Sequence, residues 1–181
     1  MEPSGPEAFA VWTTGLPASG KSTLAQALKK KLAALGVEAE VLESDALRKL
    51  FTPHPRYDEQ ERDEFYAQIA YLGGVLLKHN VSVVFDATAN RRIYREQARQ
   101  QIPRFLEVYV DTPLEACIAR DPKGIYREGR ANRSAAVPGL QTAYEPPESP
   151  DVIVHGDQEN PEAAAQRVIE KLIEKSLLPA S

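Results

Sequence analysis

The 181 residues suffice for one domain with a sizeable core, because 43% of them are hydrophobic and no shift in composition divides the chain. A formal net charge of −4 argues against binding of nucleic acid through bulk electrostatics, and no apolar run approaches the roughly 20 residues that span a bilayer, so we expect neither nucleic acid nor a membrane as a partner. A single cysteine, Cys117, leaves no partner for an intramolecular disulfide and no cysteine cluster for a metal, which fits a cytoplasmic protein.

The first eight residues precede any periodic segment and lack both a basic start and a long apolar run. We expect them to be disordered, ahead of a single domain over residues 9–178. Residues 9–13 are apolar and β-prone and predict a strand, while the spacing of leucines over 23–35 predicts a helix. Gly36 can end that helix, and residues 37–42 predict a second strand.

Between the first strand and the first helix the chain reads Gly-Leu-Pro-Ala-Ser-Gly-Lys-Ser, the pattern of a P-loop. Its glycines let successive backbone N–H groups face phosphate oxygens, its lysine reaches the β and γ phosphates, and its serine hydroxyl can ligate magnesium. The motif therefore predicts a site for a nucleoside triphosphate with Mg²⁺. The residues expected to bind ATP are Gly15, Ala18, Ser19, Gly20, Lys21, Ser22 and Thr23.

Further strands and helices alternate along the rest of the chain. Asp58, with Glu61 three residues later, predicts the N-terminus of a long helix, and Thr112, Pro113 and Glu115 predict the start of another as N-cap, first position and third position. Residues 121–150 show no sustained apolar period, which is typical of a functional segment. Strands are expected at 81–85, 105–110 and 152–154, and helices at 91–101, 113–120 and from 160 onward.

This alternation predicts an α/β protein with the three-layer P-loop NTPase fold, in which helices cover both faces of a parallel sheet of about five strands. Ligands bind such sheets at the carboxyl ends of the strands, where Asp45, Asp86 and Asp111 fall. Each aspartate could instead cap the helix that follows it, and for Asp111 we prefer that interpretation. Because phosphoryl transfer needs a carboxylate for magnesium and a group that orients the acceptor, we expect Asp45 and Asp86 to be functional.

The segment EVYVDTPLEACIARDPKGIYREGRA, followed by PGLQTAYEPPESPDVIV, closely resembles adenylylsulfate kinases, which phosphorylate the 3′-hydroxyl of adenosine 5′-phosphosulfate (APS) with ATP. Weaker similarity extends over nearly the whole chain, through the P-loop and LESDALR. The resemblance implies that Asp45 is the catalytic carboxylate beside Lys21, that Arg48 and Arg62 bind the phosphosulfate, that Tyr57 stacks on adenine and that Lys123 belongs to a lid over about 121–144. Metal ligands would come from Ser22, Asp45 and Asp86, and a homodimer is compatible with the resemblance.

The chain departs from this family pattern on the acceptor side. Thr88, Ala89 and Asn90 lie where members carry a Ser-Pro-Tyr-Arg type sequence, Phe65 aligns with an asparagine of the acceptor pocket, and Val137 aligns with a phenylalanine that closes over adenine. Because the resemblance covers nearly the whole chain, the leading hypothesis is still a magnesium-dependent APS kinase. The alternatives are a kinase of this fold that acts on another small anionic, sugar or nucleotide acceptor, and a non-catalytic nucleotide switch.

Overall fold

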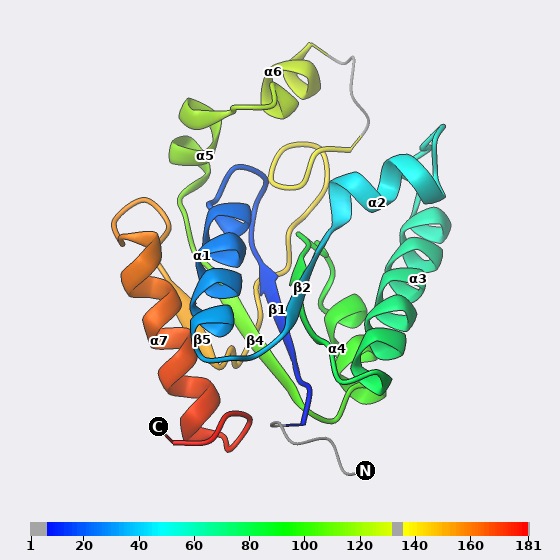
Figure 1. Cartoon of the computed structure of the whole chain (residues 1–181). Helices are drawn as coiled ribbons and strands as arrows, with labels where there is room; N and C mark the ends of the chain where they lie inside the picture. Colours follow the sequence, from blue (N-terminus) through cyan, green and yellow to red (C-terminus); the bar gives the residue numbers. More distant parts are fainter. Residues whose placement is uncertain (1–6, 132–135, 181) are drawn as a thin grey trace.

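The structure, a computed structural model, describes residues 7–131 and 136–180 and is built around a five-stranded sheet in the order β2-β3-β1-β4-β5. All neighbouring strands are parallel, so their carboxyl ends meet at one edge, the upper edge in Figure 1. The predicted parallel sheet is thus confirmed. The strands are β1 (Ala10–Thr14), β2 (Ala39–Glu43), β3 (Ser82–Asp86), β4 (Phe105–Val110) and β5 (Val152–Val154).

Helices cover both faces of the sheet, as the alternation of elements predicts (Figure 1). Successive side chains of a strand point to opposite faces, so Val11 of β1 enters one hydrophobic cluster while Trp12 enters the other. The first cluster packs under α1 (Lys21–Ala34) and α7 (Pro161–Glu174). The second packs under α3 (Glu59–Lys78) and α4 (Arg92–Gln101). The molecule therefore has three layers, with one hydrophobic core on each face of the sheet.

Three short helices lie at the carboxyl edge of the sheet (Figure 1). They are α2 (Ser44–Phe51), α5 (Leu114–Arg120) and α6 (Ile125–Arg130). A third, smaller cluster of Cys117, Tyr126 and Val137 holds α5, α6 and the following loop together. Of the segment expected to form a lid, residues 121–131 and 136–144 are described, and residues 132–135 lie outside the described part.

Helix starts agree with the sequence in two cases and disagree in one. The side chain of Asp58 accepts a hydrogen bond from the backbone N–H of Glu61, and that of Asn160 accepts from two N–H groups of α7. The prediction for Thr112 is wrong: α5 begins one residue later than predicted with Pro113 as N-cap, because the Thr112 hydroxyl donates instead to the carbonyl of Ser19, 2.8 Å away.

Of the eight N-terminal residues expected to be disordered, residues 1–6 lie outside the described part. Ala8 is buried, and its backbone N–H donates to Asn80 Oδ1. Over residues 7–131 and 136–180, no helix combines the length and the apolar character needed to cross a bilayer.

Candidate active site

The P-loop connects the end of β1 to the start of α1. Gly20 precedes the helix with a φ of 109°, a conformation that side-chain-bearing residues rarely adopt. Gly15 lies so close to β4 that a Cβ atom there would be 2.5 Å from the carbonyl oxygen of Val110. The two glycines therefore allow the loop to turn tightly against the sheet, with the N-terminus of α1 facing the cavity above it.

Lys21 is the first residue of α1 and is buried. Its ammonium donates to the carbonyl oxygen of Leu16 within the loop, over 2.8 Å. Burial lowers the pKa of Lys21, while the nearby carboxylates of Asp86 and Asp45 oppose that shift. The lysine is thus positioned where an incoming phosphate can take over its hydrogen bond.

Ser22 and Asp86 form a direct pair at the floor of the site. The Ser22 hydroxyl donates to Asp86 Oδ2 over 2.6 Å, joining the first turn of α1 to the end of β3. Asp86 is not a helix cap, because α4 begins six residues later, after Arg91 as N-cap. Hydroxyl and carboxylate oxygens are ligands that suit magnesium.

Asp45 lies in the first turn of α2 and forms an ion pair with Lys123, whose Nζ is 2.7 Å from Asp45 Oδ2. This contact joins the carboxyl end of β2 to the segment after α5. The hydrogen bond to Asp45 raises the pKa of Lys123, which stays protonated at neutral pH.

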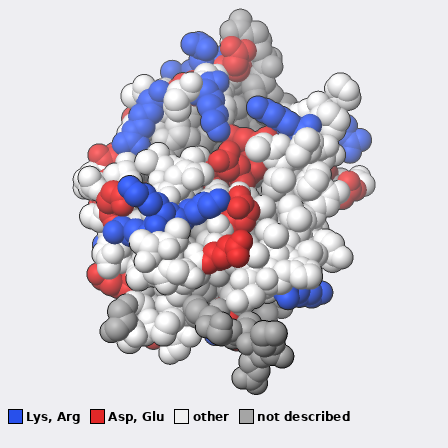
Figure 2. Space-filling view, in the orientation of Figure 1, with Lys and Arg blue, Asp and Glu red and all other residues white. Residues whose placement is uncertain are grey.

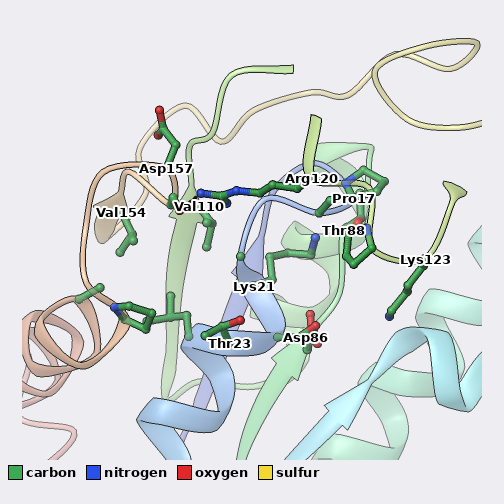
Figure 3. Close-up of a pocket in the computed structure, with 18 of the residues that line it drawn as sticks. Pro17, Lys21, Thr23, Asp86, Thr88, Val110, Arg120, Lys123, Val154 and Asp157 are labelled. Carbon is green, nitrogen blue, oxygen red and sulfur yellow. Dashed lines mark hydrogen bonds between the residues drawn. The ribbon is translucent and has the colours of Figure 1, made fainter. Parts of the chain in front are cut away.

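These groups share one cavity of about 760 Å³. In Figure 3, Lys21 and Asp86 lie on the same wall, at the ends of α1 and β3, while Arg120 and Lys123 come from the segment above. Figure 2 shows Lys and Arg side chains along the upper part of this face, with acidic side chains below them. A cavity with cations around a phosphate-binding loop suits a polyanionic ligand.

Arg48, Tyr57 and Arg62 form a second cluster on the α3 side. The Arg48 guanidinium lies 3.8 Å from the ring centroid of Phe65 and 5.3 Å from that of Tyr57, and the Arg62 guanidinium lies 5.8 Å from the Tyr57 ring. The structure thus brings the three predicted acceptor residues together, with Phe65 as the aromatic support of Arg48.

The buried guanidinium of Arg62 connects three segments of this cluster. Its nitrogens donate to the carbonyl of Tyr57, to Asn90 Oδ1 and to the carbonyl of Ala136. Asn90 in turn donates to the carbonyl of Ala143. These bonds use three of the five N–H donors of a guanidinium, so an anion at Arg62 could bind to a further N–H of either Nη.

Val137, which aligns with the family's phenylalanine, is 2% exposed and packs in the small cluster with Cys117 and Tyr126. The expectation for Asp111 needs correction. Asp111 caps no helix; it accepts a hydrogen bond from the Tyr109 hydroxyl.

Sequence reasoning missed Arg95. It pairs with Glu107 Oε1 over 2.8 Å and donates to the carbonyls of Ala89 and Glu145, so it fixes the loop that carries Asn90. It also missed Arg120, a cavity-lining residue whose guanidinium donates to the carbonyl of Gly156. Each is an arginine on a helix, which in sequence looks like an ordinary solvated side chain.

The family model for adenylylsulphate kinase matches residues 7–155, which include the P-loop, both clusters and the segment over the cavity. The chain belongs to the adenylylsulphate kinase family. Its relatives include an adenylyl-sulfate kinase of Synechococcus sp. (strain JA-3-3Ab), 40% identical over 149 residues that cover 82% of this chain and 85% of that protein. A probable adenylyl-sulfate kinase of Pyrococcus abyssi is 36% identical and covers 96% of this chain and 99% of its own length.

Solved structures agree with this membership. An APS kinase of Mycobacterium tuberculosis, in complex with AMPPNP and APS, has a TM-score of 0.86 and 32% identity to this chain, covering 92% of it and 98% of the solved chain. A gluconokinase of Sinorhizobium meliloti, at 21% identity and a TM-score of 0.53, is similar in fold alone.

Proposed function

We propose that the protein transfers the γ-phosphoryl group of ATP to the 3′-hydroxyl of APS. The observation that carries this proposal is the family match over residues 7–155, which spans the residues assigned to both substrates. Membership of this family favours APS over the sugar and nucleotide acceptors that the sequence left open.

On the donor side, the P-loop backbone would hold the phosphates and Lys21 would exchange its bond to Leu16 for a phosphate oxygen. The acceptor oxygen attacks the γ-phosphorus, the bond to the β–γ bridging oxygen breaks, and ADP leaves. Lys21, already desolvated, stabilises the charge that develops on the transferred group.

The residues at the floor fit magnesium. No group of three or more His, Cys, Asp or Glu side chains within residues 7–131 and 136–180 is arranged to hold a metal without help. Magnesium typically takes one or two protein ligands together with substrate phosphates and water, which matches the Ser22–Asp86 pair. When bound at Ser22 and Asp86, the ion would neutralise part of the charge of the phosphates.

On the acceptor side, Asp45 is the candidate to accept or orient the proton of the 3′-hydroxyl. Lys123 would then leave its ion pair with Asp45 and bind the phosphates. Arg48 and Arg62 are the candidates for the phosphosulfate and Tyr57 for the adenine ring. Guanidinium groups and an aromatic face complement two anions and a flat purine.

The test is turnover of ATP with APS, following 3′-phosphorylated APS by chromatography, beside a panel of nucleotides, sugars and 5′-hydroxyl oligonucleotides. APS should give a kcat/KM far above that of every other acceptor. Faster turnover of any panel member would refute the assignment, and ATP hydrolysis that no acceptor stimulates would support a nucleotide switch instead. The molar mass of the same preparation in solution tests whether the protein forms a homodimer. Its cytoplasmic location stays a prediction.

A further inference from the structure

Glu61 is a buried carboxylate in the first turn of α3. It lies next to the cluster of Arg48, Tyr57 and Arg62, called here the acceptor cluster, but is not among the residues assigned to substrate. It is 6% exposed. Asp58 already caps the helix by accepting from the N–H of Glu61, so the Glu61 side chain is not needed for that purpose. A buried carboxylate is costly unless it is paired, so its partners indicate what it does.

The carboxylate has three partners outside its own helix. It accepts from the backbone N–H of Arg56 over 2.5 Å and from that of Tyr57 over 3.2 Å, and Arg48 Nη1 lies 3.2 Å from its Oε1. One side chain thus fixes a loop and a helix that carry different acceptor residues.

The contact with Tyr57 matters because this residue has a φ of 59°. A bulky residue with a Cβ is strained in the left-handed region and stays there only when its surroundings hold it. Glu61 accepts from the Tyr57 N–H, and Arg62 Nε donates to the Tyr57 carbonyl over 3.1 Å. The first turn of α3 therefore holds the backbone of Tyr57 in this conformation, and with it the position of the Cβ that carries the ring.

The contact with Arg48 fixes a long, flexible side chain. The Phe65 ring supports one face of the guanidinium, and the carboxylate sets its rotation within that plane. An arginine ordered in advance loses less entropy when it binds an anion.

We propose that Glu61 is a positioning residue of the acceptor site, whose carboxylate orders Arg48 and Tyr57 for APS. This inference rests on the proposed function. The inference predicts the direction in which APS binding changes when Glu61 is neutralised, because a negative charge beside an anion site would by itself repel the phosphosulfate. If Glu61 acted only through its charge, neutralising it would improve APS binding; if it positions Arg48 and Tyr57, neutralising it weakens APS binding.

The experiment compares Glu61→Gln with wild type. Glutamine keeps the shape but replaces one acceptor oxygen by an N–H₂ group, so either Arg48 and Tyr57 or the N–H of Arg56 loses its acceptor, and the charge that holds Arg48 is gone. The KM for APS should rise roughly five- to twentyfold, while the KM for ATP and the kcat stay within about twofold. Glu64→Gln is the matched control, because Glu64 is exposed on the same helix and contacts Gln60; its constants should equal those of wild type.

Two further measurements keep the test decisive. In an Arg48→Ala background the effect of Glu61→Gln should shrink, because one of the two groups that it orders is gone. Should Glu61→Gln fail to fold, Glu61→Asp takes its place, because aspartate keeps the charge but has a shorter side chain. This variant should show a higher KM for APS than wild type, by less than twentyfold, and an unchanged KM for ATP. An unchanged or lower KM for APS in the folded variant overturns the inference, as does an equal rise for both substrates. Absence of APS turnover in wild type would instead refute the proposed function.

Discussion

Replacing Asp45 by asparagine should separate catalysis from folding, because this carboxylate lies at the mouth of the cavity. Its side chain is 60% exposed, and that of its partner Lys123 is 58% exposed. Exposed ion pairs contribute about 0–1 kcal/mol, so the Tm should fall by no more than ~4 °C. Loss of a general base typically lowers a rate by about 10²–10⁴, equivalent to roughly 2.7–5.5 kcal/mol of transition-state stabilisation.

The assay measures kcat with APS at saturating ATP and magnesium, the dissociation constant of ATP by calorimetry, and the Tm by circular dichroism. Asp111→Asn is the matched control, because Asp111 also follows a strand but contacts Tyr109 and lies outside the predicted chemistry. Its kcat should stay within about twofold of wild type. A folded Asp45→Asn variant that keeps more than a tenth of the wild-type kcat would refute the catalytic role and turn attention to Asp86.

Lys21→Ala should lower kcat by at least about 100-fold in a folded protein; retention of a tenth of the activity would contradict the P-loop assignment. Asp86→Asn should raise the magnesium concentration for half-maximal activity roughly tenfold, and an unchanged magnesium titration would exclude it as a ligand. Ser19 Oγ is buried without a hydrogen-bond partner, so Ser19→Ala should leave the Tm equal or a few degrees higher, and a clear fall would reveal a missing partner. Gly156→Ala would place a Cβ 2.1 Å from the Ser19 carbonyl oxygen, so we expect the free energy of unfolding to fall by about 1–3 kcal/mol and ATP to bind more weakly. Wild-type values of both quantities would show that the loop can shift to make room for the methyl group.

Features set by neighbouring residues could be predicted from the sequence. The P-loop and the caps at Asp58 and Asn160 depend on residues within a few positions of one another, and the structure contains all three. The same local reasoning was wrong at Thr112, because a residue 93 positions away offers its hydroxyl a carbonyl acceptor. Helix α6 was missed because its six residues include a glycine and are too few to show a period.

The sequence predicted which residues form the acceptor cluster, but not the contacts that hold them and the neighbouring loop in place. Arg95 contacts a carbonyl 50 residues away, and Arg62 contacts one 74 residues away. No spacing in the sequence reports such partners. The burial of Val137 follows from packing against α5 and α6, which an aligned position does not reveal.

The two cores on opposite faces of the sheet lie under different parts of the proposed site, one under the P-loop and the other under the residues proposed to bind APS. The buried side of α1, below the P-loop, packs in one core, whereas Phe65 of α3 and Ala89 of the loop after β3 pack in the other. Substitutions that remodel the α3–α4 face can therefore change what is phosphorylated while the phosphate cradle keeps its shape. Two of the three departures from the family pattern, at Phe65 and at residues 88–90, fall on that face. If APS binds at these residues as proposed, selection can adjust the choice of phosphoryl acceptor in this architecture without rebuilding the machinery that binds ATP.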